Sequence, residues 1–176
     1  MKLISLVPVG KIARSQMEIL AEGLGPSLQA SCSVWAERLD IDFAYDPLRG
    51  QYHSTAILQR LERVADPDAR VLAVTTLDLY VPVLTFVFGE AQLEGNCAVV
   101  SIARLDEQFY GLPHRENLLH ERLLKESVHE LGHTFGLRHC PDWQCVMASS
   151  HGVERLDIKG VDFCKSCRRE VFGFYW

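Results

Sequence analysis

Three histidines and a glutamate, close together in the sequence, could carry out hydrolysis. His129, Glu130 and His133 form the pattern H-E-x-x-H, and His139 follows six residues after His133. Residues four apart lie on one face of a helix, so His129 and His133 can bind one metal ion. Because each helical residue turns the chain by about 100°, Glu130 lies only about 60° from His133 and flanks such an ion.

A glycine explains how the third histidine returns to the first two. Gly136 stands where the helix is expected to end, and without a Cβ it can adopt a left-handed conformation that reverses the chain. Three neutral imidazoles leave the fourth position of a zinc ion open to water, which is typical of catalytic sites. Zinc lowers the pKa of that water from about 15.7 to about 7, and Glu130 would take its proton as general base in peptide-bond hydrolysis.

Chance is the alternative interpretation of H-E-x-x-H, which can arise on any charged helix. The spacing of Gly136 and His139 argues against chance and favours a zinc site. The remaining histidines lack this spacing. Each is expected to lie on the surface or to have its hydrogen bonds satisfied by neighbouring groups: His53, His114, His120 and His151.

Four cysteines form a second candidate metal site. Cys140 and Cys145 make C-x4-C, and after eighteen residues Cys164 and Cys167 make C-x2-C. Two close pairs separated by a loop are typical of a tetrahedral four-thiolate zinc site, which is closed to water and structural. Adjacent residues in an extended segment point in opposite directions, so His139 and Cys140 should serve different ions. Two disulfides and a zinc ribbon for nucleic acid are the alternatives.

Length and charge narrow the class of protein. A chain of 176 residues can form one domain with a sizeable core. The net charge of −5 disfavours nucleic-acid and anionic-membrane partners. The N-terminal MKLISLVPVG lacks the long apolar run of an export signal and predicts a strand. We therefore expect a cytoplasmic monomer without a membrane partner, in which Cys32 and Cys97 are buried free thiols.

Apolar periodicity predicts an α/β or α+β domain. Strands are expected at residues 3–8, 32–39, 41–44, 70–76, 85–90 and 97–105, the last two as a possible hairpin. Helices are expected at residues 13–24 (ending at Gly25-Pro26), 54–64 (capped by Ser54 after a loop at 46–54), 115–136, and from about 164.

The motifs together resemble the archaemetzincin family of the metzincin clan. H-E-x-x-H-x-x-G-x-x-H followed by a turn containing Met147 is similar to the clan signature. A cysteine directly after the third histidine resembles archaemetzincins, as do the segments HELGHTFGLRHC, CVMASS and LDIKGVDFCKSC within residues 122–167. RGQYHS at residues 49–54 is a looser match. Ser149 stands two residues after Met147, where astacin-type enzymes have a tyrosine ligand, so that ligand is not available here.

The resemblance implies a single metzincin-like (zincin) domain with a twisted mixed β-sheet and a long active-site helix. Residues 1–139 would form the sheet-and-helix part, and residues 140–176 a small zinc-stapled part containing the Met-turn, with Met147 as an apolar floor beneath the metal. It also implies two zinc ions per chain, one catalytic and one structural.

The activity implied is that of a zinc peptidase acting on a peptide or protein substrate, aminopeptidase-like in some family members. The substrate would pair with an edge strand, for which residues 85–90 are the candidate. A catalytically silent zinc-binding interaction or sensing protein is the alternative.

Overall fold

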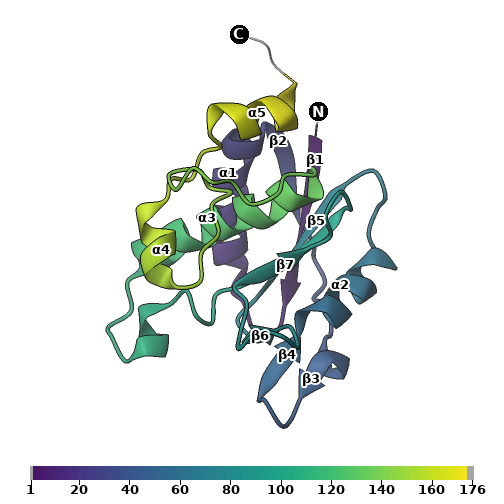
Figure 1. Cartoon of the computed structure of the whole chain (residues 1–176). Coiled ribbons are helices and arrows are strands. Elements are labelled where there is room, and N and C mark those ends of the chain that lie inside the picture. Colours follow the sequence, from purple (N-terminus) through teal and green to yellow (C-terminus); the bar gives the residue numbers. More distant parts are fainter. Residues whose placement is uncertain (1, 174–176) are drawn as a thin grey trace.

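A five-stranded mixed sheet lies at the centre of the computed structural model, which describes residues 2–173 (Figure 1). The strand order is β2-β1-β5-β8-β7. The first four of these strands are parallel, and β7 pairs antiparallel with β8 to form an edge. Their bounds are β1 Lys2–Val9, β2 Ala30–Val34, β5 Arg70–Thr75, β7 Gly89–Ala91 and β8 Cys97–Ser101. The expected mixed α/β architecture is confirmed.

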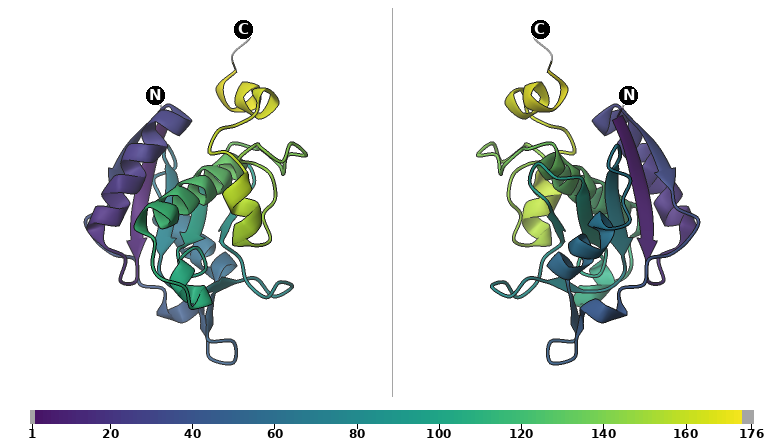
Figure 2. Two further views of the ribbon diagram at one scale, coloured as in Figure 1. Left: turned by 90° about the vertical axis from the view of Figure 1, so that its left-hand side faces the viewer. Right: turned by 90° about the vertical axis from the view of Figure 1, so that its right-hand side faces the viewer.

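Helices cover both faces of this sheet (Figure 2). Helices α1 (Arg14–Leu28) and α3 (Glu116–Thr134) pack on one face, and α2 (Ser54–Glu62) packs on the other. In β5, Leu72 and Val74 face α1 and α3 while Val71 and Ala73 face α2, because successive side chains in a strand point to opposite faces. A strand covered on both sides must be apolar throughout, which explains the run RVLAVT.

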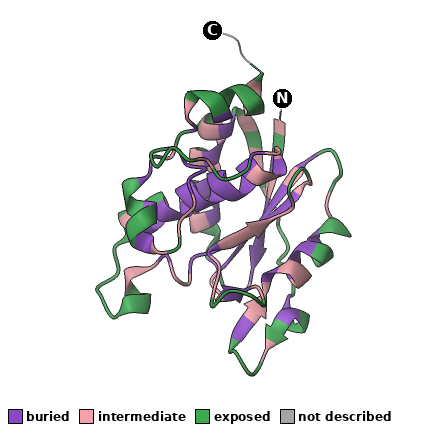
Figure 3. Cartoon of the chain, in the orientation of Figure 1, coloured by how far each residue is buried: buried purple, intermediate pink, exposed green. Residues whose placement is uncertain are grey.

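The remaining elements extend this core at both ends. A small sheet, of order β3-β4-β6, lies beside α2. The chain finishes with two short helices that are exposed on their outer sides, whereas α3 is largely buried (Figure 3). Bounds are β3 Tyr45–Asp46, β4 Gln51–His53, β6 Leu79–Tyr80, α4 Val153–Ile158 and α5 Lys165–Phe172, with 3₁₀ turns at Asp42–Ala44 and Glu107–Tyr110. Within residues 2–173, no helix has the length and apolar character that crossing a bilayer requires.

The first helix does not end where Gly25-Pro26 predicts. It continues to Leu28 and ends at Gln29, which has a left-handed φ of 49°. Proline lacks an N–H and therefore loses one hydrogen bond of the last turn. Leu24 and Leu28 are fully buried against the sheet, and this burial outweighs the lost hydrogen bond.

Four further predictions between residues 32 and 54 are wrong. The strand expected at 32–39 ends at Val34, and 41–44 contains a 3₁₀ turn instead of a strand. The expected loop at 46–54 contains β4 and part of β3. Ser54 does not cap α2, because its hydroxyl donates to the Tyr80 carbonyl and to Glu90 instead.

Candidate active site and structural metal centre

The three histidines of the H-E-x-x-H-x-x-G-x-x-H segment converge on one point. His129 and His133 lie on successive turns of α3, and His139 comes from the loop that follows. Their candidate ligand atoms all lie within 4.8 Å of one another. The Nε2 atoms of His129 and His133 are 3.2 Å apart. Two nitrogens bound to one tetrahedral zinc lie about 3.3 Å apart, so the donor set fits this ion.

Backbone carbonyls hold two of the rings in place. The Nδ1 atom of His129 lies 2.8 Å from the Val146 carbonyl, and that of His133 lies 2.7 Å from the Leu137 carbonyl. Each Nδ1 therefore donates its proton, and each Nε2 keeps a free lone pair for a metal. Burial lowers the pKa of all three histidines, most strongly that of His129. The rings are thus neutral, which is the form that binds metal.

The turn after α3 has the conformation that the sequence predicts. Gly136 has a φ of +94°, and its N–H donates to the His133 carbonyl over 2.9 Å. The Leu137 N–H donates to the Gly132 carbonyl over 3.1 Å. These bonds fix the path of the chain between the second and third histidines.

Met147 packs against α3 at Gly132, which precedes His133 in the sequence. A Cβ at Gly132 would overlap the Met147 sulfur and would come within 3.1 Å of its Cε. Met147 is itself fully buried. This position is compatible with the apolar floor expected from the sequence, and it depends on a glycine in α3 that the sequence analysis did not single out.

Glu130 lies between α3 and the edge strand β7. A Cβ added to Gly89 would come within 2.7 Å of the Glu130 Cγ and within 2.9 Å of its Oε1, so only glycine fits at that strand position. Burial raises the pKa of Glu130 well above its usual value, and the Glu126 carboxylate adds to this effect. Such a shift favours a group that takes up and releases a proton.

A cleft of about 630 Å³ opens over the histidines and Glu130. Residues before and within β7, Arg138 and residues after Met147 all contribute to its lining. The lining comprises Leu84, Thr85, Phe86, Val87, Phe88, Gly89, Glu90, Ala91, Leu93, Glu126, His129, Glu130, His133, Arg138, His139, Ser149, Ser150 and His151. The strand expected at 85–90 is wrong for residues 85–88, because β7 comprises only Gly89–Ala91. The expected hairpin with the following strand is confirmed, since β7 pairs antiparallel with β8.

Several residues of this region escaped the sequence analysis. Lys159, whose side chain is 1% exposed, pairs with Glu126 over 3.1 Å behind the cleft, although the two residues lie 33 positions apart. Arg138 and His151 line the cleft. His151 is expected from the sequence to be an ordinary surface histidine, but it lines the cleft near His139. Its position there depends on the turn after Met147, which the sequence pattern does not show. Only the i, i+4 spacing of Glu126 and Glu130 on α3 could have pointed to Glu126.

The other three histidines lie away from this cleft. His53 stacks on Tyr80 with ring centroids 5.4 Å apart, and the Nδ1 of His114 lies 2.9 Å from an Asp106 carboxylate oxygen. His120 is half-buried, and its Nε2 has no hydrogen-bond partner in the described structure, so it is not the satisfied histidine expected. Cys97 is buried as expected, whereas Cys32 is half-buried.

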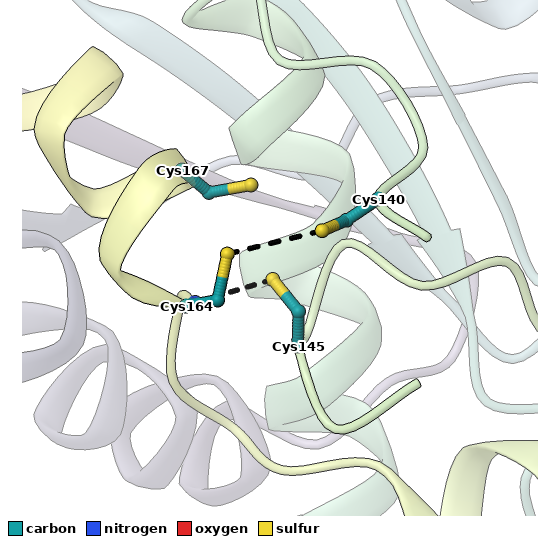
Figure 4. A group of neighbouring side chains, drawn as sticks. All are labelled: Cys140, Cys145, Cys164 and Cys167. Carbon is teal, nitrogen blue, oxygen red and sulfur yellow. Dashed lines mark hydrogen bonds between the residues drawn. The ribbon is translucent and has the colours of Figure 1, made fainter. Parts of the chain in front are cut away.

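The four cysteines gather into a second cluster (Figure 4). Cys140 and Cys145 approach from the loops around Met147, and Cys164 and Cys167 approach from the start of α5. The sulfurs of Cys140 and Cys164 are 3.8 Å apart. Two thiolates about 2.3 Å from one tetrahedral zinc have nearly this separation.

The chemistry of this cluster also fits a metal ion. Burial raises the pKa of the Cys145 and Cys167 thiols, and neighbouring cysteines add to this effect. Four thiolates so close together require a cation to compensate their charge. Cys140 faces the cysteines while His139 faces the histidines, as the alternation of adjacent side chains predicts.

Comparisons with known proteins agree with this arrangement. The profile of Peptidase family M54 matches residues 37–172. The chain is 40% identical to an archaemetzincin of Methanocaldococcus jannaschii over 169 residues, which cover 96% of this chain and 92% of that protein.

Two solved structures are similar over nearly the whole chain. One is an archaemetzincin of Archaeoglobus fulgidus in complex with malonate, with a TM-score of 0.83 and 37% identity. The other is a zinc-dependent peptidase of Methanocorpusculum labreanum, with a TM-score of 0.89 and 30% identity. Each alignment covers 96% of this chain and 99% of the other.

Proposed function

The chain belongs to peptidase family M54, the archaemetzincins, and from this membership we propose that His129, His133 and His139 hold a catalytic zinc ion beside Glu130. As a member of this family, the protein is a zinc-dependent metallopeptidase that acts on peptides or proteins. The observation that carries the proposal is the convergence of three neutral imidazoles, with ligand atoms within 4.8 Å of one another, on the floor of an open cleft.

Glu130 has the position of a general base. When bound, zinc supplies a Lewis acid for the substrate carbonyl and lowers the pKa of water at its open position. The Glu130 carboxylate faces the cleft from α3, where it can take a proton from water and pass it to the departing amine. Gly89 holds β7 close against this carboxylate and limits the number of orientations it can adopt.

The edge strand β7 can bind the substrate backbone. Ser101 donates to the Phe88 carbonyl and Gln92 donates to the Cys97 carbonyl, so residues 88, 90 and 92 face β8. Antiparallel ladders alternate, and the backbone groups of Gly89 and Ala91 therefore point outward, toward the cleft. A substrate paired there would be held largely independently of its side chains.

The four cysteines would hold a second, structural zinc ion, which makes two per chain. On this proposal the domain has two parts. Residues 1–139 contain the sheet and the catalytic histidines, and residues 140–176 form a smaller part that the second zinc ion holds together. A reduced four-thiolate site is in keeping with a cytoplasmic location. The acidic net charge of −5 supports a protein without a nucleic-acid partner, and we expect it to act as a monomer.

The test of this function is a Glu130→Gln variant. It should keep its zinc, because Glu130 is not a proposed ligand, and it should lose about 100-fold or more in kcat/KM, the scale of general-base catalysis. A peptide library read by mass spectrometry measures cleavage, and elemental analysis measures zinc. Glu116→Gln, an exposed change in the first turn of α3, is the control. Full activity in Glu130→Gln would remove Glu130 from this role.

A further inference from the structure

One side chain in the cleft is strongly basic and has no ion-pair partner in the part of the chain that the structure describes. Arg138 is the only arginine or lysine among the described residues that line it. Arg138 is exposed, and within residues 2–173 no carboxylate oxygen lies within ion-pairing distance of its guanidinium. An exposed arginine without an ion-pair partner is common on protein surfaces and does not by itself indicate a binding site. Arg138 differs because it lines the cleft that contains the three histidines.

The backbone on both sides of Arg138 is fixed. Before it, Leu137 donates to the Gly132 carbonyl over 3.1 Å and accepts from His133 over 2.7 Å. After it comes His139, whose ring lies with those of the other two histidines. The backbone of Arg138 is therefore held close to the three histidines, and its side chain starts from a fixed position on the lining of the cleft.

Two of the acidic residues that line the cleft have partners of their own. Glu126 pairs with the buried ammonium of Lys159. Glu90 alternates with Gly89 in β7 and so points to the opposite face, where its carboxylate accepts from the hydroxyls of Ser54 and Thr55. Neither carboxylate balances the charge of Arg138.

The lining of the cleft combines polar and apolar groups. Besides Arg138, the lining includes the imidazole of His151 and the hydroxyl of Ser149, which lie 3.4 Å apart and add two polar groups. The lining also includes the exposed side chains of Leu84 and Leu93. A substrate that matches this lining carries both a carboxylate and apolar groups.

We propose that Arg138 determines specificity by binding a substrate carboxylate, so that the enzyme favours peptides with an acidic group close to the bond that is cut. The planar guanidinium donates two parallel hydrogen bonds to a carboxylate, and the partly enclosed cleft strengthens them relative to bulk water. The carboxylate comes either from an Asp or Glu side chain or from a free C-terminus. This inference rests on the proposed peptidase function.

The experiment uses zinc-loaded protein and paired peptides. Each pair differs by Glu against Gln at one position, and each peptide is made with a free and with an amidated C-terminus. For at least one pair, wild-type kcat/KM should favour the carboxylate by about ten-fold or more, the scale of a hydrogen bond to a charged group. The ratio should fall toward one in Arg138→Gln and should be partly kept in Arg138→Lys.

Three features make the result decisive. Arg60→Gln, an exposed charge loss on α2, should keep the wild-type ratio. A preference for Glu over Gln at one position shows that the bound carboxylate belongs to a side chain. A preference for the free over the amidated terminus shows that it belongs to the C-terminus. A wild-type ratio near one, or an equal ratio in wild type and Arg138→Gln, would overturn the proposal.

Binding separates this inference from the peptidase function itself. The same peptides, labelled with a fluorophore, are titrated into zinc-loaded Glu130→Gln with and without Arg138→Gln, and anisotropy reports affinity. If no peptide is cut by wild type but the Arg138-dependent binding preference is present, the peptidase function fails while the carboxylate site stands. If binding also shows no preference, the carboxylate site is wrong.

Discussion

Lys159 is the residue whose burial is hardest to explain by stability alone. Its ammonium lies 3.1 Å from the Glu126 carboxylate and 3.2 Å from the Ala148 carbonyl, one residue after Met147. It thereby joins α3, one turn before Glu130, to the chain segment that follows Met147. Buried ion pairs of this kind are often no better for stability than apolar residues of similar size. The bridge instead fixes the relative position of two parts of the site.

Removing one partner of this pair should be costly. Lys159→Met leaves the Glu126 carboxylate buried without its cation, and the free energy of unfolding should fall by about 3–5 kcal/mol. Urea denaturation of the zinc-loaded protein measures this. The control is Arg14→Met, which breaks the exposed Arg14–Glu18 pair on α1 and should cost less than about 1 kcal/mol. Equal costs for the two variants would contradict the bridge.

At the scale of elements, the edge strand β7 combines two tasks. Its Gly89 lets α3 bring Glu130 close, and its outward backbone groups face the cleft. These tasks use different atoms, so they can be separated by mutation.

Ala91→Pro should weaken substrate binding without unfolding the sheet. The Ala91 N–H points away from β8, and proline is tolerated at such edge positions. Losing one hydrogen bond to the substrate backbone should raise KM by about 2- to 10-fold with kcat little changed. Glu90→Pro is the contrast, because its N–H faces β8 and its loss should lower stability. An unchanged KM in folded Ala91→Pro would mean that the substrate does not pair with β7.

We expect helix α5 to depend on a bound metal ion more than on packing. Its only buried residue is Cys167, one of the four cysteines of the second cluster. A structural zinc site contributes about 10–16 kcal/mol of apparent binding free energy, far more than this short helix gains from burial.

Cys164→Ser should therefore remove one zinc per chain and destabilise the protein by more than about 4 kcal/mol. Elemental analysis and thermal unfolding measure the two effects. Cys32→Ser, a change at a half-buried cysteine in β2, is the matched control and should keep both zinc ions. Two zinc ions in Cys164→Ser, or a single ion in the reduced wild-type protein, would count against the four-cysteine site.

At the scale of the whole molecule, the sequence predicted best what depends on local spacing. The imidazoles of His129 and His133 meet because they are four residues apart on one helix, and Gly136 has the left-handed conformation that its position requires. The buried strand β5 follows from its unbroken apolar run. Each of these features is decided by a few neighbouring residues.

What the sequence could not predict depends on long-range packing. Pro26 lies inside α1 because Leu28 is buried in the core formed by the sheet, α1 and α3, and Ser54 bonds to Glu90, 36 residues away, instead of capping its own helix. Lys159 meets Glu126 across 33 residues for the same reason. No local sequence pattern marks Arg138 as a functional residue. Its proposed role follows only from its position in the cleft of the folded protein.

The most direct test of the catalytic centre is anomalous diffraction at the zinc edge from crystals of the reduced protein. The account predicts one peak bounded by nitrogens of His129, His133 and His139 with a light atom as fourth ligand, and a second among the four cysteine sulfurs. A vacant histidine site, or a sulfur in the fourth position there, would contradict it.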